Sequence, residues 1–206
     1  LCVLGTGLLW AGWYGFNAGS ALAADGIAVQ AFLTTTLGAA AATLSWAAVE
    51  IFHRGKPSVL GLCSGAIAGL ATITNAAGFV STSSSVLIGV VAGALSYAAC
   101  SYLKGKLKYD DALDTFGVHG VGGTVGAIAT ALLVSSKVNP ATEGIIKSSL
   151  IKGQLVAMGV CILLSVVATA LLAKLVQKTV GLRPTEEEEA QGLDIADHGE
   201  EGYNHG

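Results

Sequence analysis

One long apolar, glycine-rich segment constrains the fold of this chain most. It runs from Phe116 to Val134, and His119 is its single ionisable side chain before Lys137. Read as a helix, the segment is about long enough to cross a ~30 Å hydrocarbon core at 1.5 Å per residue. An imidazole at that depth is costly unless it faces the protein interior or a water path. The segment therefore predicts a membrane helix with a functional site at His119.

Small residues accompany this histidine on one predicted helical face. Thr115, His119, Gly122 and Gly126 follow at i, i+4, i+7 and i+11. They leave room either for something to pass or for close helix packing. From the residues alone two interpretations stay open: a histidine on a transport pathway, or a histidine that only hydrogen-bonds a neighbouring helix.

The composition indicates a membrane protein throughout the chain. Its 206 residues are 52% hydrophobic and only 12% charged, about half the charge of an average soluble domain. We therefore predict an all-α polytopic membrane protein. The chain begins at Leu1, already within an apolar segment, so we expect that an N-terminal part is missing.

Six apolar segments predict six transmembrane helices. They cover about residues 1–22, 27–51, 58–74, 86–103, 116–134 and 150–176. We assign 1–178 to a transmembrane domain and 179–206 to an acidic tail. With alternating spans, eight basic residues fall on the side of the tail and three on the other, which predicts a cytoplasmic C-terminus.

Glycines recur every four residues in two of these spans. Gly61, Gly65 and Gly69 form one ladder, and Gly89 and Gly93 form another. This spacing is typical of helices whose backbones approach closely.

The first span carries an aromatic face. Leu9, Trp13, Phe16 and Ser20 recur at helical spacing. The face can be an interfacial aromatic belt. Alternatively it is a vestibule, because aromatic rings attract small cations and a serine hydroxyl accepts hydrogen bonds.

Other chemistry lacks support in the residue pattern. The cysteines have no metal-like spacing, so we predict no metal site and no cofactor. No phosphate-binding loop, dinucleotide motif or nucleophile elbow occurs, so an enzyme is not indicated. The few dispersed basic residues argue against nucleic-acid binding. Asn139-Pro140-Ala141 matches a water-channel tripeptide in a single copy, and we interpret it as a coincidence.

Several motifs together carry a family resemblance. They are Gly12–Ser20, Gly55–Ser58, Gly65–Gly69, Asp114–Gly123, and in the tail Gly181–Arg183 and Gly192–Gly199. In order and content the chain resembles the ammonium transporter (Amt/Mep/Rh) family, nearest the bacterial Amt branch. The resemblance implies a homotrimer in the cell membrane, each subunit having eleven helices in two inverted halves and a last long helix. The six spans here would be helices six to eleven.

The resemblance also implies roles for single residues. His119 would be the second of two paired pore histidines, and Phe16 one of two phenylalanines that gate the outer mouth. Trp13 would line the pore, and Ser20 would belong to an outer recruitment site. Two pore-lining neighbours and two acidic residues at the inner end of the pore helix complete the set: Ile67, Thr115, Asp111 and Asp114. We further expect the Asp114 carboxylate to cap backbone N–H groups of that helix.

The function implied is conduction of ammonium or ammonia through an apolar pore. The cation would lose a proton at a histidine relay, because an apolar pore does not compensate an ion for its lost hydration. The expected partners are ammonium, membrane lipid and a P-II-type regulatory protein at the cytoplasmic face. Two alternatives remain: an ammonium sensor that signals through its tail, and an Rh-like channel for the neutral gas.

Overall fold

The computed structural model describes residues 1–202 of the chain. Within that range it contains helices and turns and no β-strand, as the predicted all-α class requires. The chain divides into two compact units, one ending at Met158 and the other beginning at Gly159. Residues 203–206 of the predicted tail lie outside the described residues.

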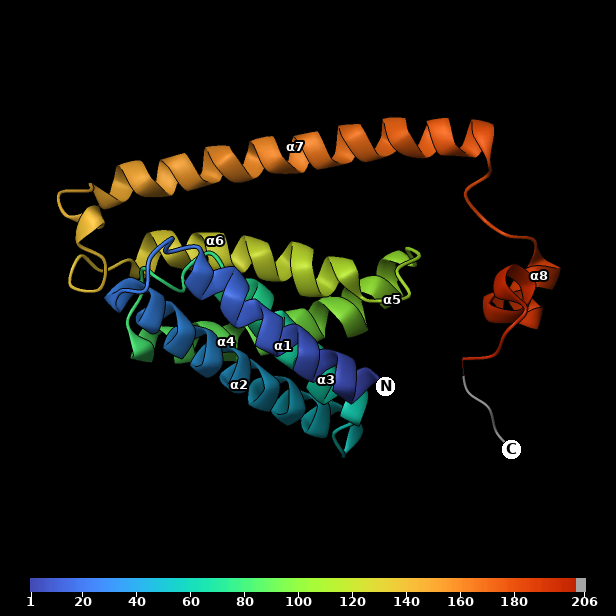
Figure 1. The fold of residues 1–206 in the computed structure, drawn as a ribbon, viewed down its shortest axis with the longest axis horizontal. Coiled ribbons are helices and arrows are strands. Elements are labelled where there is room, and N and C mark those ends of the chain that lie inside the picture. The colour runs from blue at the N-terminus through green and yellow to red at the C-terminus, as the bar shows by residue number, and fades with distance from the viewer. Residues whose placement is uncertain (203–206) are drawn as a thin grey trace. The chain divides into compact units, whose positions relative to one another are not determined.

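The helices are labelled in Figure 1. Segments η1, η2 and η4 are π-helical turns and η3 is a 3-10 turn. In chain order the helices and helical turns are α1 (Cys2–Gly19), α2 (Gly26–Arg54), α3 (Val59–Ile73), α4 (Thr82–Ala98), η1 (Ala99–Leu103), α5 (Lys104–Leu107), η2 (Phe116–Val121), α6 (Gly122–Leu133), η3 (Pro140–Thr142), α7 (Lys147–Thr179), α8 (Glu186–Gln191) and η4 (Asp194–His198).

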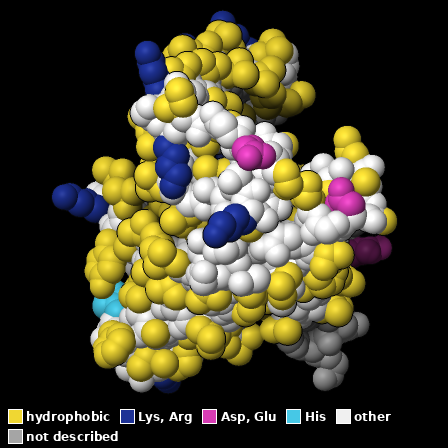
Figure 2. Space-filling model, turned by 90° about the vertical axis from the view of Figure 1, so that its left-hand side faces the viewer, with side chains coloured by type: hydrophobic (Ala, Val, Ile, Leu, Met, Phe, Trp, Pro, Cys, Tyr) yellow, Lys and Arg dark blue, Asp and Glu magenta, His cyan; other side chains and the backbone are white. Residues whose placement is uncertain are grey.

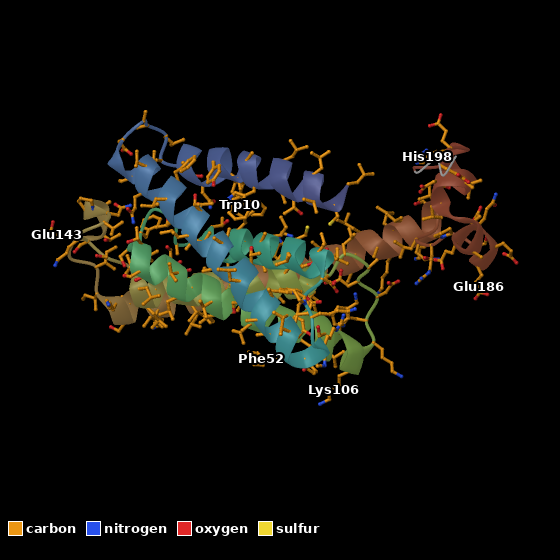
Figure 3. All side chains as sticks on the ribbon, turned by 90° about the horizontal axis from the view of Figure 1, so that it is seen from below. Trp10, Phe52, Lys106, Glu143, Glu186 and His198 are labelled. Atoms are coloured by element: carbon orange, nitrogen blue, oxygen red, sulfur yellow. The ribbon has the colours of Figure 1, made fainter. Side chains whose placement is uncertain are left out.

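Polar caps fix where the helices of the first unit begin and end. Asp25 Oδ1 accepts the backbone N–H groups of Ile27 and Ala28, both at 2.9 Å, which starts α2. Gly55 ends α2 with φ +82°, a left-handed conformation that suits glycine. Ser58 then caps α3. Short connections of this kind return consecutive helices antiparallel to one another, and Figure 3 shows Lys106 and Glu143 at opposite ends of the resulting bundle.

Helix α2 packs against α1, α3 and α4. The closest approach is to α4, where a Cβ added at Gly89 would overlap the Gly38 carbonyl oxygen. A Cβ added at Gly93 would likewise overlap the carbonyl oxygen of Ala42. The predicted role of this glycine pair in close helix packing is confirmed.

A buried carboxylate joins α2 to α3. Glu50 is only 3% exposed, and its two oxygens accept the Ser58 N–H at 3.0 Å and the Ser58 Oγ–H at 2.8 Å. Gly61 leaves the space that Glu50 needs, because a Cβ there would overlap its carboxylate. The start of α3 is thus anchored to the end of α2.

Several helices have the length and composition of membrane spans. Among residues 1–202 there are four: Gly26–Arg54, Thr82–Leu107, Phe116–Leu133 and Lys147–Thr179. Helix α3 is a shorter apolar helix of 15 residues. Figure 2 shows hydrophobic side chains over much of the visible face, with lysine and arginine at scattered points. The chain is a multi-pass membrane protein, and the count of six spans stays a prediction.

Candidate pore site

An aromatic row lies on α1. The rings of Trp13 and Phe16 meet edge to face with their centroids 5.9 Å apart. Ser20 follows at the end of the helix, where its hydroxyl donates to the Phe16 carbonyl oxygen at 2.6 Å. Three residues predicted to act together therefore follow one another along one side of α1.

His119 lies across from this row. Its ring is nearly parallel to that of Trp13, with an angle of 11° and a centroid separation of 6.5 Å. The indole N–H of Trp13 donates to Thr74 Oγ1 at 2.8 Å, and the Thr74 hydroxyl donates to the Leu70 carbonyl oxygen at 2.7 Å. Since the indole N–H is already bonded, what Trp13 can offer a ligand is the face of its ring.

The row and the histidine lie on an open face of the first unit. Phe16 is 62% exposed and His119 is exposed, whereas Gly117 and Val118 beside the histidine are buried. An apolar groove of about 570 Å³ runs along α1 and is lined by Gly5, Leu8, Leu9, Gly12, Trp13 and Phe16. Trp13 and Phe16 thus border an apolar surface.

The helix that carries His119 differs from the regular α-helix expected for it. Its first six residues, Phe116–Val121, form the π turn η2, and α6 continues from Gly122. The wider turn rotates the side chains relative to α-helical spacing. Consequently Thr115 and His119 are exposed, while Gly122 and Gly126 are buried, so the four residues do not share one face.

The aromatic row borders a second, more polar cavity of about 350 Å³. Its lining includes Phe16, Ser20, Thr74, Phe79 and Asn139. The Asn139 side chain donates to the Gly78 carbonyl oxygen at 3.3 Å and caps η3 by accepting the Ala141 N–H at 3.1 Å. In this chain the Asn-Pro-Ala tripeptide therefore joins the loop before α4 to the loop after α6.

Ile67 is half-buried and packs against the buried cluster of Trp46, Ala68, Tyr97 and Val118. That cluster includes Val118, the residue before His119. Thr115, the other expected neighbour, stands at the start of η2.

The start of the His119 helix is held by Asp111, not by Asp114 as expected. The two Asp111 carboxylate oxygens accept the N–H groups of Thr115 at 2.9 Å and Phe116 at 2.8 Å. Asp114 instead forms an ion pair of 2.7 Å with Lys104. Its backbone has φ +55°, in the left-handed region.

Nearby groups complete the electrostatics of this end. Burial raises the pKa of the Tyr109 phenol, and the negative charge of Asp111 adds to that rise. The phenol therefore stays a neutral group beside two carboxylates. Within residues 1–202 no three His, Cys, Asp or Glu side chains lie together as metal ligands do.

Sequence reasoning missed two residues of the site. Thr74 orients Trp13 and lines the 350 Å³ cavity with Asn139. Thr74 opens a polar segment between two apolar spans, which was the available signal. Its partner lies 61 residues away, so the contact itself could not be found from spacing.

Known proteins match this chain over almost its whole length. The family model described as Ammonium Transporter Family matches residues 1–203. The ammonium transporter of Bacillus subtilis is 47% identical over 203 residues, which are 97% of this chain and 50% of that protein. The ammonium transporter Amt1 of Archaeoglobus fulgidus is 42% identical over 205 residues, 98% of this chain and 52% of that protein.

Two solved structures are similar to this chain in fold as well as in sequence. The crystal structure of Saccharomyces cerevisiae Mep2 superposes with a TM-score of 0.81 at 36% identity, covering 90% of this chain and 43% of that one. A structure of a sensor Amt protein superposes with a TM-score of 0.86 at 32% identity, covering 95% of this chain and 48% of that one. The chain spans about half the length of the curated relatives it matches. From the family match and these relatives together, the chain belongs to the ammonium transporter family.

Proposed function

We propose that this chain forms the second half of an ammonium transporter, which conducts ammonium or ammonia through an apolar pore. The observation that carries the proposal is the stack of Trp13 and His119 on an open face of the bundle. The similarity to named ammonium transporters supplies the substrate. We propose transport and no enzymatic reaction.

The mechanism follows from the order of the groups. The Ser20 hydroxyl and the faces of Phe16 and Trp13 favour a small cation, through hydrogen bonding and cation–π attraction. Beyond them the surface is apolar, and an ion gains little there to offset its lost hydration. Ammonium can lose its proton and continue as neutral ammonia. His119 relays that proton, because an imidazole can accept at one nitrogen and donate from the other.

Transport is tested by pulses of ammonium on the full-length protein in proteoliposomes. A saturable current that potassium does not evoke is the expected result. Uptake without current would favour a neutral gas channel of the Rh type. Neither uptake nor current would contradict the transport proposal.

Sensing is the second candidate, because the chain superposes on a structure described as a sensor Amt protein. A sensor would bind ammonium and change the state of its tail or of a partner without net uptake. Binding of ammonium by the full-length protein with no flux across the bilayer would favour this function over transport.

Assembly and regulation complete the proposal. We propose that the protein is a homotrimer in the cell membrane, with residues 1–178 in the bilayer and 179–206 as a cytoplasmic tail. A P-II-type protein is the proposed partner of the tail side. Deleting residues 185–206 should abolish its binding in a pull-down. Unchanged binding would refute this assignment of the tail.

A further inference from the structure

The loop before the His119 helix is held in an unusual backbone conformation. Residues 108–115 connect α5 to η2, and two of them, Lys108 and Asp114, have positive φ values of 52° and 55°. A side chain with a Cβ disfavours this left-handed region. Contacts elsewhere must therefore hold the loop in place.

One cation supplies the most direct of these contacts. Lys104 is the first residue of α5, and its Nζ donates to the Asp111 carbonyl oxygen at 2.5 Å and to Asp114 Oδ1 at 2.7 Å. Both partners belong to the strained loop. The charged side chain of Lys104 thus connects the end of the α4–η1 helix to the loop before η2.

The contact continues into the helix that carries His119. Lys104 donates a hydrogen bond to the backbone carbonyl oxygen of Asp111. The Asp111 carboxylate in turn accepts hydrogen bonds from the N–H groups of Thr115 and Phe116. His119 follows three residues after Phe116. Charge-assisted hydrogen bonds of this kind are short and strong.

The two π turns also touch one another. Gly117 of η2 lies against Cys100 of η1, so closely that an added Cβ would overlap the Cys100 Sγ atom. A π turn is an uncommon geometry that occurs mostly as a single turn within an α-helix. Lys104 and this packing contact fix η2 from two sides.

We infer that Lys104 is a positioning residue for His119. It sets the start of η2 through Asp111 and Asp114 and thereby aims the imidazole at Trp13. The functional part of this inference rests on the proposed transport function; the structural part does not.

The structural part is tested by amide hydrogen exchange of the full-length protein. Lys104→Met should raise the exchange rate at Thr115 and Phe116 about tenfold, because losing a charged hydrogen bond frees their acceptor. Lys104→Arg should restore most of the protection. Lys106→Met is the matched control on the same short helix and should change neither amide. Unchanged exchange in Lys104→Met would overturn the inference.

The functional part is tested by the ratio of ammonium to potassium current. If the substitution only reduces the amount of folded protein, both currents fall in proportion and their ratio stays unchanged. We expect the ratio to fall in Lys104→Met and to recover in Lys104→Arg. Should Lys104→Met fail to fold, Asp114→Asn, which keeps the side-chain shape, serves the same test.

The two proposals fail in different ways. A wild-type protein that takes up no ammonium contradicts the transport proposal, and the exchange measurement still decides the role of Lys104. A wild type that transports, beside a Lys104→Met variant with the wild-type ratio and exchange, contradicts the inference alone.

Discussion

At the scale of single residues, the site depends on one hydrogen bond between distant segments. Trp13 could be recognised in the sequence, but its orientation follows from Thr74 on another helix. With its N–H bonded there, the indole ring meets the Phe16 ring edge to face and lies nearly parallel to the His119 ring. The residue thus joins the aromatic row of α1 to His119, the group that we propose relays the proton.

Replacing Trp13 with phenylalanine should weaken ammonium binding. The variant loses the bond to Thr74 and offers a poorer cation–π face, each worth about 1 kcal/mol. We expect the apparent affinity for ammonium to fall roughly fivefold or more, measured from the concentration dependence of the current. Trp10→Phe is the control, since Trp10 bonds Tyr14 and lies outside the row. Equal affinities in the two variants would contradict the role given to Trp13.

At the scale of elements, helix packing was easier to predict than helix irregularity. The four-residue spacing of Gly89 and Gly93 predicted the close approach that the structure shows. The π turns at η1 and η2 have no such signal, because tertiary contacts such as that of Lys104 with Asp114 fix them. For the same reason the cap of the His119 helix was assigned to Asp114 when Asp111 performs it.

Crowding the α2–α4 crossing should destabilise the bundle. Gly93→Leu forces α4 away from the Ala42 carbonyl oxygen, and overpacking of this kind costs about 1–3 kcal/mol. We expect a lower midpoint of thermal unfolding in detergent. Gly105→Leu is the matched control, because nothing lies within 4 Å of a Cβ added at Gly105. Equal midpoints for both variants would show that the crossing tolerates a side chain.

The tail helix α8 should be sensitive to acid. The Thr185 backbone N–H, at 2.7 Å, and then its hydroxyl lower the pKa of the Glu188 carboxyl. A lowered folded-state pKa stabilises α8 above the ordinary glutamate pKa, and this stabilisation is lost as the pH falls through the lowered value.

Hydrogen exchange of residues 185–191, corrected for its intrinsic pH dependence, measures this loss. Protection should fall on acidification in the wild type. The fall should be absent in Glu188→Ala and retained in Glu187→Ala. A wild-type response in Glu188→Ala would contradict the capping role.

At the scale of the whole molecule, the sequence predicted the class of fold. Apolar segments and motif order were sufficient for the all-α membrane class. The rings of Trp13, Phe16 and His119 lie near one another, and their place on a transport pathway stays a prediction. The grouping of Thr74 and Asn139 around the more polar cavity, and the burial of Glu50, could be found only from three-dimensional contacts. Such contacts join segments far apart in the chain, which local periodicity does not encode.

The central claim is that His119 lies on the ammonium pathway. Its most direct test is the current evoked by ammonium and by potassium in the full-length protein, compared between the wild type and His119→Ala and normalised to folded protein. The account predicts that the variant loses ammonium current or begins to conduct potassium. An unchanged ammonium current with unchanged selectivity would contradict it and leave His119 a packing residue.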